Sequence, residues 1–160
     1  MSYSKQSHTK SPYKPGGTLS FVRGNWAGRV VMQGQDELGR WSYVIFEDKG
    51  GNKIMFLIFY RICKKNTESG GYTIQTQQER DQYDKRKSHQ DPREVILRDL
   101  EKEISLKHKE GYKIFVFGDI NNDVRDTQRV NEFLMKSQLK NIMKCKFPTT
   151  TLPSTYARSS

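Results

Sequence analysis

The chain has 160 residues, only 34% of which are apolar, and it carries a net charge of +10 at neutral pH. This length allows one domain with a real core, and the charge favours polyanionic partners such as nucleic acid or an anionic membrane surface. The longest apolar run, residues 54–60, is far shorter than the ~20 residues of a membrane helix, so we expect no membrane-spanning segment.

The amino-terminal part begins with a polar segment and continues with extended structure. Residues 1–16 are mostly Ser, Lys, Tyr, Pro and Gly, which predicts a flexible basic segment without the apolar core of a secretory signal. Residues 18–22 (TLSFV) are expected to form a strand. GNWAG then breaks this strand, and RVVMQ begins another extended segment.

Two β-prone runs in the next part of the chain predict a hairpin inside a buried sheet. WSYVIFE (41–47) follows a turn at 36–40 and is strongly β-prone. DKGGN (48–52) supplies a turn with two glycines. The run 54–60 is continuously apolar, which is typical of a strand covered on both faces.

A long polar segment separates this hairpin from a helix. Residues 62–90 show little periodicity, and we expect a loop with a helical turn near 77–83. Asp91 is the expected N-cap, Pro92 stands at the first helical position, and Glu94 completes a capping-box-like start. The inward positions then recur at helical spacing, at Ile96, Leu100 and Ile104.

The last third predicts one more strand and one more helix. Gly111 ends the first helix, and KIFVF (113–117) predicts a short buried strand that stops at Gly118. A second amphipathic helix is expected at 127–139, and residues 140–160 are expected to be extended and loop-like. The order of strands, loop, helix, strand and helix predicts an α/β protein.

Oxygen-bearing side chains follow the 113–117 strand directly, in the sequence GDINND. Such residues are common in turns, and a plain turn is one interpretation. A second interpretation rests on placement, because active sites often lie at the carboxyl ends of buried strands in α/β proteins. Asp119 and Asn121 are two residues apart, and at an extended strand end they would point the same way. A carboxylate beside an amide suits Mg²⁺ together with a phosphate oxygen.

Several segments, taken in order, resemble the endonuclease/exonuclease/phosphatase superfamily. They are GGTLSFVRGNWAGRV, GRWSYVIFED, the apolar strand that ends in FYR, the strand followed by GDINND, and the final LPSTYARSS. The likeness covers roughly residues 15–160 and is closest to the apurinic-type endonuclease domain of non-LTR retrotransposons. It implies a partial four-layer, DNase I-like β-sandwich flanked by helices over residues 17–160. It also implies a Mg²⁺- or Mn²⁺-dependent phosphodiesterase that hydrolyses nucleic acid, with DNA as the expected substrate.

The resemblance assigns functions to the residues that match the family's motifs. Asp119 and Asn121 correspond to the GDxN pair, which contacts the nucleophilic water and the scissile phosphate, and Asp119 is the implied metal ligand. Tyr60 corresponds to a strand-end tyrosine near that phosphate. The implied substrate-binding residues are Arg61, Thr155 and Arg158.

The chain also departs from the family's pattern. Ile58 stands where the commoner pattern has Asn, which removes one phosphate contact. The family's metal-binding Glu on an early strand and its terminal Asp-His pair have no counterpart here, and the three histidines stand elsewhere. We therefore expect an internal fragment without the first and last strands of the domain, whose open sheet edges and apolar faces lower its stability.

Two other functions fit the same residues. The chain could be a catalytically dead remnant that binds nucleic acid through charge alone, or a phosphatase-type member that acts on a phosphate ester. A retroelement origin further implies a reverse transcriptase in the same parent polyprotein. Cys63 and Cys145 lack metal-ligand spacing and favour a reduced intracellular setting, nuclear or cytoplasmic. Trp41 is expected in the core, whereas Trp26 suits either packing or base stacking.

Overall fold

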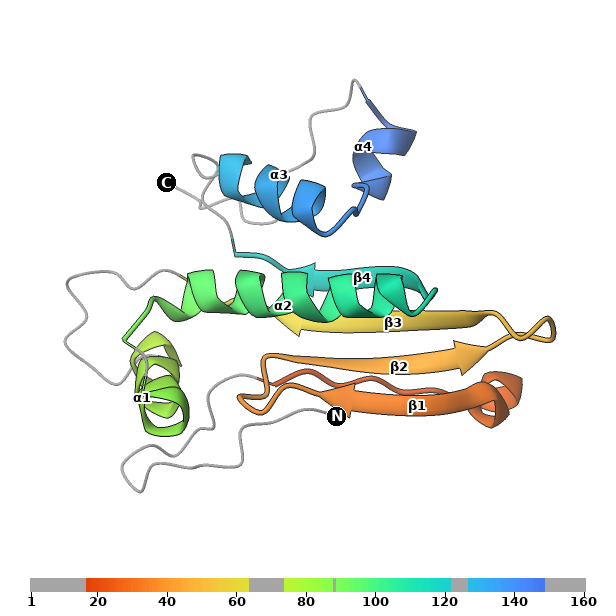
Figure 1. Ribbon diagram of the computed structural model, residues 1–160, viewed down its shortest axis with the longest axis horizontal. Coiled ribbons are helices and arrows are strands. Elements are labelled where there is room, and N and C mark those ends of the chain that lie inside the picture. The colour runs from red at the N-terminus through yellow and green to blue at the C-terminus, as the bar shows by residue number, and fades with distance from the viewer. Residues whose placement is uncertain (1–16, 64–73, 88, 122–126, 149–160) are drawn as a thin grey trace, which may run out of the picture.

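The computed structural model describes residues 17–63, 74–87, 89–121 and 127–148, and Figure 1 shows their arrangement. In chain order, its elements are the 3-10 helix η1 (Gly24–Arg29), strands β1 (Val30–Gln35), β2 (Trp41–Glu47) and β3 (Lys53–Tyr60), helices α1 (Ile74–Arg86) and α2 (Pro92–Lys109), strand β4 (Lys113–Asp119), and helices α3 (Thr127–Lys136) and α4 (Ile142–Lys146). No helix within these described ranges is long and apolar enough to cross a membrane.

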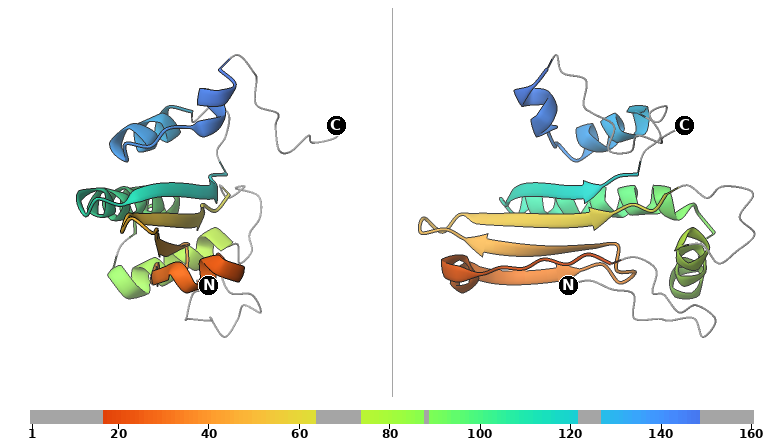
Figure 2. Two further views of the ribbon diagram at one scale, coloured as in Figure 1. Left: turned by 90° about the vertical axis from the view of Figure 1, so that its right-hand side faces the viewer. Right: turned by 180° about the vertical axis from the view of Figure 1, so that it is seen from behind.

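The four strands form one sheet in the order β1-β2-β3-β4. The expected hairpin is present, because β2 and β3 pair antiparallel along their whole length. β3 and β4 pair in parallel, and α1 and α2 lie in the connection between them. α2 lies over one face of the sheet in both views of Figure 2. This mixed sheet with its helices confirms the α/β class that the order of elements predicts.

The main core lies between α2 and the sheet face that it covers. Met55, Leu57 and Phe59 alternate along β3 on this face and are buried. They pack against the apolar side of α2, where the inward positions expected from helical spacing are also buried, at Ile96, Leu100 and Ile104. Trp41 belongs to the same core, as expected. Because burying one such side chain contributes about 1.5–3 kcal/mol, this layer holds α2 firmly on the sheet.

The start of α2 agrees with the sequence prediction. The Asp91 side chain accepts a hydrogen bond from Arg93 N at 2.8 Å, and Pro92 occupies the first turn. Gly111 follows the helix with a φ of 82°, a left-handed conformation that favours glycine. The Glu94 carboxylate does not complete a capping box, because its oxygens bind two arginine side chains instead.

The opposite face of the sheet is only partly covered. The sequence predicts that β3 is covered on both faces, but Ile54, Phe56 and Ile58 on this second face are half-buried. The Phe56 ring stacks on those of Phe115 and Phe117, with centroid distances of 5.2 and 6.1 Å. Phe115 and Phe117 are 40% and 50% exposed. The prediction of two covered faces is therefore wrong for the described residues, and we call this surface the open face.

Residues 18–22 do not form the expected strand. Thr18 makes a single bridge, and its hydroxyl lies 2.8 Å from the Ser42 hydroxyl on β2. The following residues have no regular secondary structure, and Phe21 is 85% exposed. β-propensity does not suffice here, because a strand also needs a neighbour for its backbone groups and its side chains.

Trp26 lies in η1 at the edge of the open face. Its ring packs edge-on against Phe46, with a centroid distance of 5.9 Å, and the Arg29 guanidinium lies 5.7 Å from its centre. The side chain is still 56% exposed, and it lines an apolar pocket of about 430 Å³ together with Phe56 and Phe117. Both expectations for Trp26 stay open, because the ring packs on the sheet and also reaches solvent.

α1 (Ile74–Arg86) occupies part of the segment 62–90, where the sequence predicts a loop with a helical turn near 77–83, so the helix is longer than expected. Polar contacts hold this helix in place, which explains why its apolar periodicity is weak. The buried Gln82 side chain donates from Nε2 to Gln90 O at 2.8 Å. Lys85 Nζ donates to Glu37 O at 2.6 Å, next to the β1–β2 turn. Tertiary packing rather than intrinsic propensity stabilises many helices of this kind.

The carboxy-terminal part contains one expected helix and one unexpected helix. α3 begins at Thr127 as predicted, ends at Lys136 rather than at residue 139, and buries Phe133 in the core. α4 lies within residues 140–160, where the sequence predicts extended structure. Asn141 explains this difference, because its side chain caps the short helix by accepting a hydrogen bond from Lys144 N at 3.1 Å.

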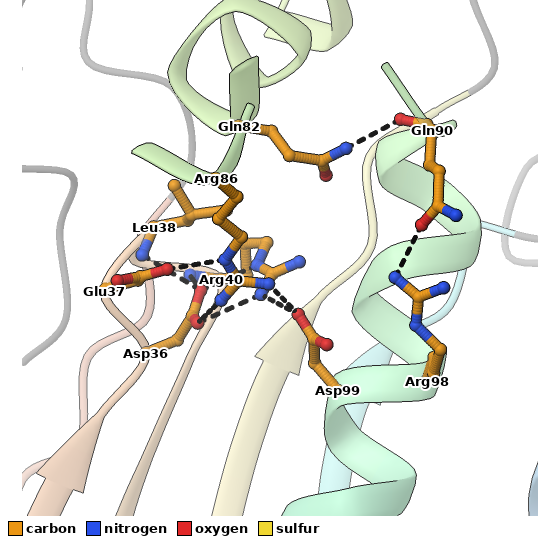
Figure 3. A network of polar contacts seen from close by, with 9 residues as sticks. All are labelled: Asp36, Glu37, Leu38, Arg40, Gln82, Arg86, Gln90, Arg98 and Asp99. Carbon is orange, nitrogen blue, oxygen red and sulfur yellow. Dashed lines mark hydrogen bonds and ion pairs between the residues drawn. The ribbon is translucent and has the colours of Figure 1, made fainter. Parts of the chain in front are cut away.

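A buried polar network joins the β1–β2 turn to α1 and α2 (Figure 3). The Asp36 carboxylate accepts hydrogen bonds from Arg40 Nε and Nη2 at 2.6 and 3.0 Å. Arg40 Nη2 also donates to Asp99 Oδ2 on α2 at 2.8 Å. Arg86 of α1 contacts Asp99 and donates from Nε to Glu37 at 2.6 Å. The predicted turn at 36–40 is therefore fixed by charges from two helices.

Asp99 is expected to stabilise the fold in a pH-dependent manner. Burial raises the pKa of its carboxyl, but hydrogen bonds from Arg40 and Arg86 outweigh burial and hold this pKa below its ordinary value of 3.8. Its contribution is complete above that value and is lost as the pH falls through the lowered pKa. We expect Asp99→Asn to reduce the free energy of unfolding by about 1–3 kcal/mol at neutral pH. When urea denaturation is repeated over a range of pH, the free energies of unfolding of the unmodified protein and of Asp99→Asn should converge well below pH 3.8.

Glu37→Gln is the matched control for this experiment. Glu37 pairs with the same Arg86 guanidinium, but its side chain is 53% exposed. Because exposed ion pairs contribute about 0–1 kcal/mol, this variant should lose clearly less stability than Asp99→Asn at neutral pH. Equal losses in the two variants would contradict the importance of the buried network.

Candidate functional site at the carboxyl edge of the sheet

Tyr60 and Asp119 come from distant parts of the sequence and lie side by side at one edge of the sheet. β3 and β4 are parallel, so both strands end at this edge, and the two residues are partners in the strand register. The pairing extends one residue further, where Arg61 N donates to Asp119 O at 2.9 Å. The parallel pairing therefore brings together two side chains that the sequence singles out separately.

Asn121 joins this pair through the turn that follows β4. Its backbone N–H donates to Asp119 Oδ1 at 3.0 Å, and its φ of 42° lies in the left-handed region that asparagine tolerates. Its side-chain Nδ2 donates to Arg61 O at 2.7 Å, and its Oδ1 accepts from the Cys63 thiol at 3.1 Å. GDIN thus forms a turn that also gathers a polar cluster. We call this cluster the strand-end group, which consists of Tyr60, Cys63, Asp119 and Asn121.

The Tyr60 hydroxyl remains protonated at neutral pH. Burial is the largest cause that raises its pKa above the ordinary value of 10.0, and the charges of Cys63 and Asp119 raise it further. A hydrogen bond with Asn121 acts in the opposite direction without cancelling these effects. The phenol can therefore donate a hydrogen bond to an anionic oxygen at this edge of the sheet.

Arg61 lies inside the protein and not at the surface of the site. Its side chain is 1% exposed, and its Nε donates to Arg93 O at 3.0 Å. Its Nη1 donates to Ile120 O at 3.4 Å, and its Nη2 pairs with Glu94 at 3.3 Å. This placement does not fit the direct phosphate contact expected from the sequence. Arg61 is a positioning residue here, because it connects the loop after β4 to α2.

Arg93 lies in the first turn of α2 and contacts both the loop after β3 and the loop after β4. Its Nη1 contacts Ile62 O, and its Nη2 donates to Asn121 O at 2.9 Å. Like Arg61, it is buried. We call Arg61 and Arg93 the arginine clamp, because together they tie the loops after β3 and β4 to each other. The sequence contains no signal for this function, since an arginine in a first helical turn is usually exposed.

Like Arg93, Cys63 is a residue of the site that the sequence did not single out. It stands three residues after Tyr60, and it is exposed and reduced. Its spacing from Cys145 carries no metal signature, and its contacts with Asn121 and Tyr60 connect it with the site. The sequence position directly after a strand end is the signal that could have drawn attention to it.

Asp119 offers a ligand for a hard cation. Its side chain is exposed, and among the described residues its carboxylate accepts one hydrogen bond, at Oδ1 from Asn121 N. A single carboxylate agrees with Mg²⁺ sites, which commonly use one or two carboxylates and keep several waters. The described residues contain no cluster of three His, Cys, Asp or Glu side chains that could hold a metal ion. Among the described residues, Asp119 is thus the one carboxylate that the strand-end group offers to a metal ion.

Three further positions belong to the expected family pattern, namely Ile58, Thr155 and Arg158. Thr155 and Arg158 lie outside the described residues. Ile58 is half-buried on the open face and lines the apolar pocket with Phe117. Ile58 therefore has an apolar environment, and the expected loss of a phosphate contact there stays a prediction.

No protein-family profile, curated protein or solved structure matches the chain.

Proposed function

We propose that the strand-end group is part of a Mg²⁺-dependent phosphodiesterase site that hydrolyses nucleic acid, with Asp119 as a metal ligand. The observation that carries this proposal is the register pairing of Tyr60 with Asp119, whose carboxylate also bonds to Asn121. These are the three catalytic residues that the superfamily resemblance selects, and Tyr60 comes from a different segment than Asp119 and Asn121. The net charge of +10 supports a polyanionic substrate, with DNA as the expected one.

Each side chain has a separate function in this proposal. The Tyr60 phenol, kept protonated by its raised pKa, donates to a non-bridging phosphate oxygen. The Asn121 side chain donates to Arg61 O and also hydrogen-bonds to Tyr60, so it holds the phenol in place beside Asp119. Asp119 would hold Mg²⁺ or Mn²⁺, and a bound metal supplies Lewis-acid polarisation of the phosphoryl group.

The open face supports the finer fold that the resemblance implies. Phe56, Phe115 and Phe117 form a row of rings on this face, beside a pocket of about 430 Å³. Exposed apolar surface of this kind marks a contact with another layer of structure. A second sheet on the open face would complete a four-layer, DNase I-like sandwich, with the strand-end group at one of its ends.

A plasmid-nicking assay tests the proposed activity. Supercoiled DNA is incubated with the purified chain and Mg²⁺, and relaxed circles are counted on a gel. We expect Asp119→Ala to lower the nicking rate by about 10²–10³-fold, because the site loses its metal ligand and part of its charge stabilisation. Glu79→Ala is the control, since this exposed carboxylate on α1 bonds to Gln75 Nε2 far from the strand-end group in sequence.

Each outcome of the nicking assay decides between the candidate functions. Equal nicking by the Asp119→Ala and Glu79→Ala variants would refute the proposal, as would nicking that persists in EDTA. Tight, salt-sensitive DNA binding without any nicking would favour a basic nucleic-acid-binding remnant. Hydrolysis of a small phosphate ester but not of plasmid would favour a phosphatase-type activity.

A further inference from the structure

A basic groove lies between α2 and the end of α3. Its volume is about 580 Å³, and four cationic side chains line it, namely Arg98, Lys102, Lys109 and Lys136. Glu101 is the carboxylate in the lining. One Glu101 oxygen, Oε1, is buried, and its charge acts on Arg129 of α3. Positive charge therefore dominates the accessible part of this groove.

Helix geometry places three of these cations in one stripe. Arg98, Lys102 and Lys109 are separated by four and by seven residues, a spacing that keeps side chains on one side of an α-helix. At 1.5 Å per residue, the stripe extends over roughly 16 Å. One strand of duplex DNA presents a phosphate about every 3.4 Å along its axis. The stripe is therefore long enough to contact several phosphates.

Among the described residues, the groove cations form no direct ion pair with a carboxylate, although the charges of Lys136 and Glu132 interact at longer range. Basic side chains elsewhere in the structure lie within 4 Å of a carboxylate oxygen, as at Arg40, Arg86, Lys107 and Arg129. In the part of the chain that the structure describes, none of the four groove cations has such a partner, and Arg98 donates to the neutral Gln90 side chain at 2.6 Å. Their charge remains available to an external anion.

We propose that this groove binds the phosphate backbone of nucleic acid, at a surface separate from the strand-end group. An acidic peptide is the other polyanion to consider. A helical peptide needs a row of apolar contacts, whereas the groove lining contains one exposed apolar side chain, Leu106. Lysine and arginine contacts to phosphates carry no base preference, so the binding is independent of DNA sequence. The proposal requires no hydrolysis and does not depend on the proposed activity.

Fluorescence anisotropy with a labelled DNA duplex tests the groove. The titrations are made in EDTA, so that no metal-dependent hydrolysis can occur, at salt concentrations from about 50 to about 200 mM. The double variant Lys102→Gln/Lys109→Gln removes two charges from the exposed stripe. We expect it to bind at least about tenfold more weakly at low salt, and the slope of log K against log [salt] to fall by about 2.

Lys49→Gln/Lys87→Gln is the matched control, because it removes the same charge from exposed residues outside the groove. We expect its slope of log K against log [salt] to change by less than half as much as that of Lys102→Gln/Lys109→Gln. Equal changes in the two double variants would overturn the proposal. It would also be overturned if the unmodified protein bound polyglutamate but did not bind the DNA duplex. A loss of nicking in Asp119→Ala leaves this result unaffected, so the two proposals fail separately.

Discussion

Replacement of Gly118 by alanine is expected to destabilise the protein by about 1–3 kcal/mol and to displace Asp119. Gly118 is the register partner of Phe59, and a Cβ atom at position 118 would lie 2.4 Å from the Phe59 ring and 2.5 Å from its carbonyl oxygen. Neither group can move easily, because the ring is buried in the core and the carbonyl belongs to β3. Urea denaturation measures the loss of stability, and the nicking assay measures the displacement of Asp119.

Gly28→Ala provides the matched control for this steric argument. A Cβ atom at Gly28 meets nothing within 4 Å, and the substitution should change stability by no more than about 0.5 kcal/mol. If both alanine variants unfold at the same urea concentration, the close packing of Gly118 on Phe59 does not prevent a larger side chain at position 118. A normal nicking rate in a destabilised Gly118→Ala variant would show that Asp119 does not move.

Loss of the Arg93 side chain is expected to lower the free energy of unfolding by about 2–5 kcal/mol, since two backbone carbonyls then lose a charged donor. Arg93→Met keeps the aliphatic length but removes the contacts to Ile62 O and Asn121 O. The loops after β3 and β4 should separate, and the Cys63 thiol should react faster with a thiol reagent. A Cys145→Ser background isolates this reaction, because both cysteines are exposed.

Arg98→Met tests whether these effects belong to the arginine clamp. Arg98 also lies on α2, but its guanidinium contacts one exposed side chain, Gln90. We expect it to change stability by no more than about 0.5 kcal/mol and to leave Cys63 reactivity unchanged. A clamp function would be contradicted if Arg93→Met lost stability without any change in the Cys63 reaction rate.

Local signals were sufficient for the helix and the hairpin that build the core. The Asp91 cap and the spacing of Ile96, Leu100 and Ile104 act within a few turns, so they are visible without knowledge of the tertiary fold. The strand end at Tyr60 could be located for the same reason, whereas β4 extends to Asp119, two residues beyond the strand predicted at 113–117. Their pairing required the further inference that the two strands are parallel neighbours.

Segments whose structure depends on distant partners were not predictable. α1 has a polar sequence and is held by Gln82, Lys85 and Arg86, all of which bond to residues outside the helix. Residues 18–22 have an apolar, β-prone sequence but do not join the sheet as a strand. In α1, tertiary contacts stabilise a helix that its local propensity does not predict. In residues 18–22, tertiary packing does not support the strand that the local propensity predicts.

By itself, the sequence determined the α/β class, the strand end at Tyr60, the GDIN segment that follows the later strand, and the excess of positive charge. Only the tertiary structure decided that Arg61 turns inward, that Arg93 joins it from α2, and that one sheet face stays open. These features depend on which segments meet across the parallel pairing of β3 with β4. A periodic pattern records which side of an element is apolar, but it does not record which element that side will meet.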